Sequence, residues 1–198
     1  IVGSYFYGIL MMESSGVTVE DCSISGNVRG FYVYNATGST FTGNNITNNE
    51  IGMDMQISSG STFRSNNFDN THNLAVFGEI ISQFALDIDT SNTVNDKKVY
   101  WLINKQNMVI SPTTHPDVGM LALINCQNMT VSDLEISNNG QGLILAYSIN
   151  TRVYRMTFRD NHNGILIFSS SSNELTNNLI TNCFRALQIS RTSTYNTI

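Results

Sequence analysis

Three aspartates have a spacing that carboxylate chemistry could use. Asp54 is the single acidic residue on the predicted outward face of the first strand of each repeat, and Asp87 and Asp89 alternate on an irregular segment that could approach it. Paired carboxylates serve glycosidic hydrolysis, and carboxylates that hold Ca²⁺ serve elimination when a base removes the proton. No Lys, Arg or His belongs to the outward set around Asp54. Solvated edge charges are the simpler interpretation, so we predict no catalytic residue and no turnover of uronate polymers.

The histidines and the cysteines do not form a ligand set. Metal sites need ligands that converge at matched spacings, and a disulfide framework needs an even number of cysteines. We therefore predict no metal, no cofactor and no disulfide, and we expect the cysteines to be small buried residues. These residues occupy unrelated positions of distant repeats: His72, His115, His162, Cys22, Cys126 and Cys183.

An internal repeat explains how the chain would position such residues. Residues 102–111 read LINKQNMVIS, and residues 123–132 read LINCQNMTVS, with seven of ten positions identical. The period is about 22 residues elsewhere, as the spacing of Gly8, Gly30 and Gly52 shows. Apolar residues alternate with polar ones in short runs, which indicates strands, and Asn, Ser and Gly clusters between the runs indicate turns. A unit this small cannot bury its own apolar face, so copies must stack.

Stacking of these units predicts an all-β, right-handed parallel β-helix. We call each 22-residue turn a coil, and we expect roughly eight coils with an irregular insertion near 78–96. Each coil adds about 4.8 Å, and equivalent residues lie above one another. At 198 residues the chain is expected to be one domain, 1–198, open at both ends or part of a larger chain.

Asparagine columns follow from the same register. One column shares its slot with Cys22, Leu134 and Met156, which indicates an inward position, and a second lies at another corner with Thr71 as a variant. Inward amides on adjacent coils can hydrogen-bond along the axis as a ladder. The alternative is that these asparagines only form turns. The first column contains Asn44 and Asn66, and the second contains Asn27, Asn49, Asn139 and Asn161.

The outward face of the first strands is unusually apolar. Soluble monomers rarely expose so large an apolar patch. Three explanations remain open: the 78–96 insertion or a neighbouring domain covers the patch, a second copy packs on it, or sugar rings stack on its tyrosines. The possible contact residues are Tyr32, Tyr34, Asp54, Ile144, Leu166 and Phe168, with Leu10 and Met12 beside them.

The runs NTVNDKKVYWLINKQN at 92–107 and GLILAYSINTRVYRMTFRDNHNGILIFSSSSNELTNN at 142–178 resemble the NosD and carbohydrate-binding/sugar-hydrolase (CASH) β-helices. The resemblance covers nearly the whole chain and implies the fold, because the matching residues are structural ones. It also implies a secreted or cell-surface protein. NosD proteins serve copper-protein maturation, but no Met, His or Cys copper motif carries over. Alginate epimerases and lyases belong to the same group, and no segment matches their catalytic motifs.

Composition narrows the function to two classes. Only 13% of residues are charged and the net charge is −5, which excludes nucleic acid as a partner, and no apolar run is long enough to span a membrane. The first class is a non-catalytic, self-associating structural module of a cell-surface, S-layer or sheath-like protein. Its partners would be other copies, bound end to end or laterally, or neighbouring domains. The second class is a carbohydrate-binding or polysaccharide-active β-helix, acting as a lyase, hydrolase or epimerase.

Overall fold

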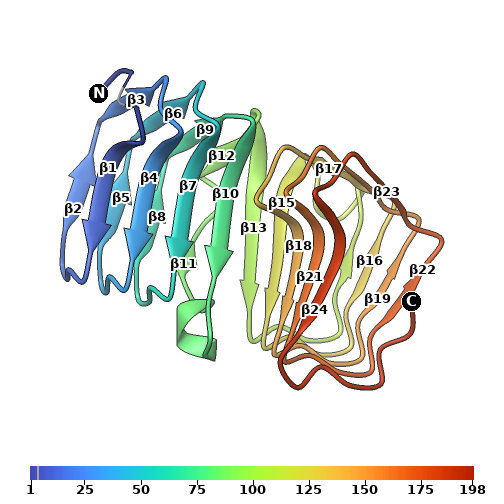
Figure 1. Cartoon of the computed structure of the whole chain (residues 1–198). Coiled ribbons are helices and arrows are strands. Elements are labelled where there is room, and N and C mark those ends of the chain that lie inside the picture. Colours follow the sequence, from blue (N-terminus) through green and yellow to red (C-terminus); the bar gives the residue numbers. More distant parts are fainter. Residues whose placement is uncertain (4) are drawn as a thin grey trace.

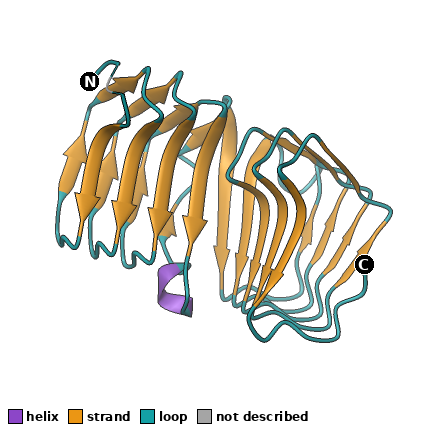
Figure 2. Cartoon of the chain, in the orientation of Figure 1, coloured by secondary structure: helices purple, strands orange, loops and turns teal. Residues whose placement is uncertain are grey.

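The structure, a computed structural model, describes residues 1–3 and 5–198 and confirms the predicted β-solenoid. Nearly all neighbouring strands pair in parallel, with partners such as Ile24 and Ile46 separated by 22 residues. The coils form two stacks that meet at a corner (Figure 1). One short 3-10 helix, Ile81–Gln83, lies beside that corner, and strands and loops make up the rest of the described chain (Figure 2).

The N-terminal stack, residues 7–95, has three walls. Its first wall is β1 (Tyr7–Met12), β4 (Arg29–Tyr34), β7 (Ile51–Gln56) and β10 (His72–Phe77). Its second wall is β2 (Thr18–Glu20), β5 (Thr40–Thr42), β8 (Thr62–Arg64) and β11 (Asp87–Ile88). Its third wall is β3 (Ser23–Ser25), β6 (Asn45–Thr47), β9 (Asn67–Asp69) and β12 (Thr93–Val94).

The C-terminal stack, residues 97–198, repeats this plan. Its first wall is β13 (Lys97–Ile103), β15 (Val118–Ile124), β18 (Gln141–Ala146), β21 (Asn163–Phe168) and β24 (Arg185–Ser190). Its second wall is β14 (Val109–Ile110), β16 (Thr130–Ser132), β19 (Arg152–Tyr154) and β22 (Glu174–Thr176). Its third wall is β17 (Glu135–Ser137), β20 (Thr157–Arg159) and β23 (Leu179–Thr181).

A tight hairpin joins the two stacks and was not predicted. Strand β13 runs antiparallel to β12, with Val94 opposite Lys97, so only Asn95 and Asp96 form the turn. Both turn residues have positive φ, 50° and 61°, as a two-residue type I′ hairpin requires. The third wall of the N-terminal stack therefore continues into the first wall of the C-terminal stack as one nine-stranded sheet.

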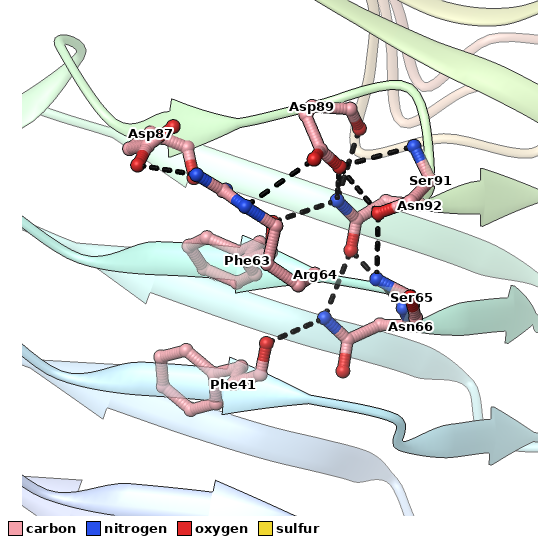
Figure 3. A network of polar contacts seen from close by, with 9 residues as sticks. All are labelled: Phe41, Phe63, Arg64, Ser65, Asn66, Asp87, Asp89, Ser91 and Asn92. Atoms are coloured by element: carbon pink, nitrogen blue, oxygen red, sulfur yellow. Dashed lines mark hydrogen bonds and ion pairs between the residues drawn. The ribbon is translucent and has the colours of Figure 1, made fainter.

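Buried amides run through the N-terminal stack as ladders. The Asn44 side-chain amide donates to Asn66 Oδ1 over 2.9 Å. The Asn66 amide in turn donates to Asn92 Oδ1 over 2.8 Å and to the Phe41 carbonyl (Figure 3). All three asparagines are buried. The ladder satisfies backbone groups that the corners between strands would otherwise leave without partners. A second ladder runs through Asn27, Asn49, Asn70 and Asn73, so Asn70 takes the slot expected for Thr71.

The first wall of the C-terminal stack closes the hydrophobic core of the N-terminal stack. Its outward side chains pack into one buried cluster with the interior of the N-terminal stack. Phe84, from the irregular segment 78–96, lies 5.0 Å from Phe168 between ring centroids, and its carbonyl accepts a 2.8 Å hydrogen bond from the Trp101 indole. Segment 78–96 thus lies over the outward face at Phe168, whereas Leu10 and Met12 at the other end of that face stay about half exposed. Ile144, Leu166 and Phe168 are buried, not exposed as the outward stripe would require.

We expect Asn66→Leu to lower the free energy of unfolding by about 2–4 kcal/mol, because it leaves the buried Asn44 N–H without its acceptor and removes the side-chain hydrogen bonds to Asn92 and to the Phe41 carbonyl. Urea unfolding followed by circular dichroism measures the change. Asn45→Ala, one residue from the Asn44 column and exposed, serves as the matched control and should cost less than about 0.5 kcal/mol. Equal costs for both variants would contradict a structural ladder.

We expect Phe84→Ala to destabilise the protein by about 3–5 kcal/mol, since it opens a cavity where the two stacks share their core. Ile80→Ala is the control in the same segment, because Ile80 is 55% exposed. Urea unfolding of both variants provides the comparison. A Phe84 variant as stable as the Ile80 variant would show that segment 78–96 does not close the core.

Candidate functional site

A groove follows the inner corner where the two stacks meet, and we call it the corner groove. It consists of two hollows of about 300 and 200 Å³ that share Gln56 and Phe77 in their linings. The smaller hollow is also lined by Arg29, Ile51, Asp54, His72, Ala75, Gly140 and His162. The larger hollow is also lined by Ile57, Gly78, Glu79, Phe84, Leu166, Phe168, Gln188, Ser190 and Arg191.

The close approach of the stacks depends on a few contacts at β10. Gly140 faces Ala75, and a Cβ atom added at Gly140 would lie 2.3 Å from the Ala75 Cβ atom. The Gly140 N–H donates to the Leu74 carbonyl over 3.0 Å, and the Val76 N–H donates to Gln141 Oε1 over 3.0 Å. These bonds satisfy the free edge of β10 and fix the two walls of the corner groove against each other.

A buried ion pair forms the polar centre of the smaller hollow. Asp54 Oδ2 accepts a 2.9 Å hydrogen bond from Arg29 Nε, and the Gln56 amide donates to both Asp54 oxygens over 3.2 and 3.3 Å. The Asp54 side chain is 5% exposed, and that of Arg29 is 29% exposed. Both oxygens of the carboxylate therefore accept hydrogen bonds from neighbouring side chains, which holds Asp54 in a fixed orientation.

Tyrosine rings extend this centre along the first wall. Tyr7 and Tyr32 stack at 5.3 Å between centroids, and Tyr32 and Tyr34 stack at 6.4 Å. The Arg29 guanidinium lies 5.9 Å from the Tyr7 centroid and 5.5 Å from the Tyr32 centroid. Tyr32 is the cross-strand partner of Asp54. Burial, followed by the Asp54 charge, raises the pKa of Tyr32, so its hydroxyl remains a hydrogen-bond donor at neutral pH. The platform of Tyr7, Tyr32 and Tyr34 is hereafter the tyrosine ladder.

Two histidines from different stacks meet at one end of the groove. His72 and His162 contact edge to face, with ring centroids 5.9 Å apart, and Phe184 stacks on His162 at 4.9 Å. Burial lowers the pKa of His72, and the neighbouring His162 lowers it further, while Glu50 acts in the opposite direction. His72 is therefore neutral at pH 7.

A second ion pair lies in the larger hollow. Arg191 Nη2 is 3.1 Å from Glu79 Oε1, which links segment 78–96 to the last coil of the C-terminal stack. Phe168 and Gln188 line the same hollow. Both hollows of the corner groove therefore combine polar and apolar groups from the two stacks.

Asp87 and Asp89 lie on a different wall from Asp54, so the three carboxylates do not form the cluster that their spacing left possible. Both bind Arg64 on the second wall, where Arg64 Nη2 is 2.6 Å from Asp87 Oδ2 and Arg64 Nε is 3.2 Å from Asp89 Oδ2 (Figure 3). Asp89 also accepts hydrogen bonds from Ser91. Strand β11 continues the second wall, whereas Asp54 lies on the first wall, so the pairing of β11 with β8 separates them.

Arg29 was missed because simple alternation places it inward with Phe31. The structure instead pairs it with Asp54, which corrects the expectation that no cation accompanies this carboxylate. The strand is irregular at Gly30, where an added Cβ atom would lie 2.6 Å from the Gly52 carbonyl oxygen. The 22-residue spacing of the glycines was the signal that alternation fails at this corner. Of the predicted contact residues, Tyr32, Tyr34 and Asp54 lie together, Leu166 and Phe168 line the larger hollow, and Ile144 lies outside both linings.

Comparison with known protein families agrees with the β-solenoid fold of the structure. Residues 88–198 match the family described as a right handed beta helix region, and residues 1–95 match the family described as periplasmic copper-binding protein (NosD). No curated protein matches the chain. Within residues 1–3 and 5–198, no helix has the length and apolar character needed to cross a membrane.

Two solved structures from Azotobacter vinelandii are similar to this chain. The A-module of mannuronan C-5 epimerase AlgE4 is 13% identical, with a TM-score of 0.34, over 93% of this chain and 58% of that one. The A-module of mannuronan C-5 epimerase AlgE6 is 15% identical, with a TM-score of 0.33, over 92% of this chain and 57% of that one. This chain thus spans less than three fifths of either module.

The His, Cys, Asp and Glu side chains that the structure describes do not form a copper-binding group. Copper sites use imidazole together with thiolate or thioether ligands. In the described part of the chain, no three His, Cys, Asp or Glu side chains gather in a way that could hold a metal. His72 and His162 form only a pair, and Phe184 covers one ring of that pair.

We expect the free energy of unfolding to fall as the pH drops below about 6.5, the ordinary pKa of histidine. The folded-state pKa of His72 is lowered, so the unfolded chain takes up the proton first and gains stability relative to the fold. Urea unfolding at pH 7.5 and pH 5 measures this loss. His72→Gln should show a smaller loss, and some should remain because burial also lowers the pKa of His115. An unchanged loss in His72→Gln would contradict this assignment.

Proposed function

We propose, on the premise that the chain belongs to the right handed beta helix family, that the corner groove binds a polysaccharide strand. The observation that supports this most directly is the tyrosine ladder beside the fixed polar groups of Arg29, Asp54 and Gln56. Pyranose rings present apolar C–H faces that stack on aromatic rings, and their hydroxyl groups need oriented donors and acceptors. Both kinds of group occur here on rigid strands.

The groove has the shape for an extended ligand. Its two hollows share Gln56 and Phe77 and together follow the corner between the stacks. Cross-strand pairing places Tyr32 next to Asp54 and Tyr34 next to Gln56, so the ladder borders the groove directly. A chain of sugars can therefore contact rings on the first wall and polar groups at the corner at the same time.

Binding is favoured over cleavage in this proposal. Glycoside hydrolysis requires a carboxylate that is free to donate or accept a proton. Asp54 has both oxygens engaged by Arg29 and Gln56, and Glu79 is engaged by Arg191. A binding module outside the cytoplasm, on or near the cell surface, is the role we propose for such a groove.

Self-association remains a second proposal with a smaller surface than the sequence predicted. Burial of Ile144, Leu166 and Phe168 removes three of the seven residues of the predicted apolar stripe. Leu10 and Met12 remain about half exposed, at 49% and 52%. Sedimentation of the wild type and of Leu10→Lys at the same concentration tests this contact. A shift of the variant towards monomer supports association, and a wild type that is already monomeric contradicts it.

We expect Tyr32→Ala to weaken polysaccharide binding by about tenfold or more, because it removes the central ring of the tyrosine ladder. Affinity electrophoresis in gels that contain a panel of polysaccharides measures the change for every polymer that retards the wild type. Tyr154→Ala is the matched control, since Tyr154 lies between Arg152 and Arg155 on the second wall of the C-terminal stack, away from the groove. No retardation by any polymer, or equal effects of both variants, would contradict the proposed function.

A further inference from the structure

The charged side chains that line the corner groove form two pairs of opposite sign. Arg29 and Asp54 are 2.9 Å apart in the smaller hollow, and Arg191 and Glu79 are 3.1 Å apart in the larger one. Each guanidinium in the lining already has its own carboxylate, so the four groups contribute no net charge. His72 adds none at neutral pH, because burial lowers its pKa.

The rest of the molecule does not make the groove attractive to an anionic polymer either. The chain carries a net charge of −5, with ten Lys and Arg against fifteen Asp and Glu. A polyanion approaching the groove would meet long-range repulsion and no uncompensated cation in the lining. A polymer with a carboxylate or sulfate on each sugar would therefore meet Asp54 or Glu79 beside each arginine that it could bind.

The arrangement around Arg29 makes such a displacement unfavourable. Its Nε atom donates a hydrogen bond to Asp54, and its guanidinium carbon lies over the rings of Tyr7 and Tyr32, 5.9 and 5.5 Å from their centroids. The side chain is thus held in one orientation, with a carboxylate as its immediate neighbour. A second carboxylate at the guanidinium would lie close to Asp54, and like charges this close repel strongly in a partly buried site.

Hydroxyl groups match the same arrangement. A hydroxyl donates one hydrogen bond and accepts others, whereas an ionised carboxylate only accepts. The groove presents Asp54 as an acceptor beside donors from Arg29 and Gln56, with Tyr32 on the neighbouring strand. We propose that the occupant of the corner groove is an uncharged polysaccharide rather than a polyuronate or a sulfated glycan. This inference rests on the proposed function and narrows its ligand class.

The test compares neutral and anionic polymers at two salt concentrations. Affinity electrophoresis of the whole chain uses dextran, mannan and xylan against alginate, polygalacturonate and hyaluronan, at low and high NaCl. We expect at least one neutral polymer to bind tenfold or more tightly than every anionic polymer, with less than a twofold change between the salt concentrations. Charge-driven binding would instead weaken steeply as salt rises.

Asp54→Asn tests the charge argument directly, because it leaves Arg29 without its carboxylate while keeping the shape of the side chain. We expect binding of the anionic polymers to increase at least fivefold and to become sensitive to salt. Asp133→Asn is the matched control: it removes the same charge from an exposed pair with Arg155, 2.7 Å apart and outside the groove, and should leave binding of every polymer within twofold of wild type. Circular dichroism of both variants verifies the fold.

The outcomes separate the two proposals. Tight, salt-sensitive binding of a polyuronate by the wild type, weakened by Tyr32→Ala, would overturn the uncharged ligand and leave the binding groove in place. Equal polyanion binding by Asp54→Asn and Asp133→Asn would also overturn the charge argument. Failure of every polymer to bind would overturn both the groove and its ligand class.

Discussion

A nine-stranded sheet that serves two hydrophobic cores at once holds this molecule together. One face of its C-terminal half packs inside its own stack, and the other face closes the core of the N-terminal stack. A solenoid without such a cover would expose its last coil to water. Residues 95 and 96 decide this arrangement, because their positive φ values turn β13 back along β12. The cover, the corner and the groove all follow from that reversal.

Repeat analysis of the sequence was sufficient for the architecture within each stack. The 22-residue spacing of residues such as Ile24 and Ile46 places equivalent side chains in register, and the structure has the same register. The columns of Asn44 and Asn66 followed from the same count and form hydrogen bonds along the axis. Such regularities are local in kind, since each coil contacts only its neighbours.

The corner could not be predicted from the repeat, because it depends on where the repeat fails. Asn95 and Asp96 are residue types that favour a turn. Their types do not indicate that the strand after the turn continues the same sheet. Once the chain direction reverses, outward side chains such as Leu166 and Phe168 become part of the core of the N-terminal stack. The pairing of Arg29 with Asp54 was hidden for a related reason, since the backbone at Gly30 departs from strict alternation.

The shared sheet also determines how this protein could change its length during evolution. Duplication or loss of one whole coil changes the length of that stack by about 4.8 Å and keeps every column in register. The same event across residues 95 and 96 would destroy the hairpin and uncover a core. This architecture therefore permits related proteins whose two stacks differ in the number of coils, while the hairpin between the stacks stays the same. The walls beside that hairpin would lengthen or shorten by one coil at a time.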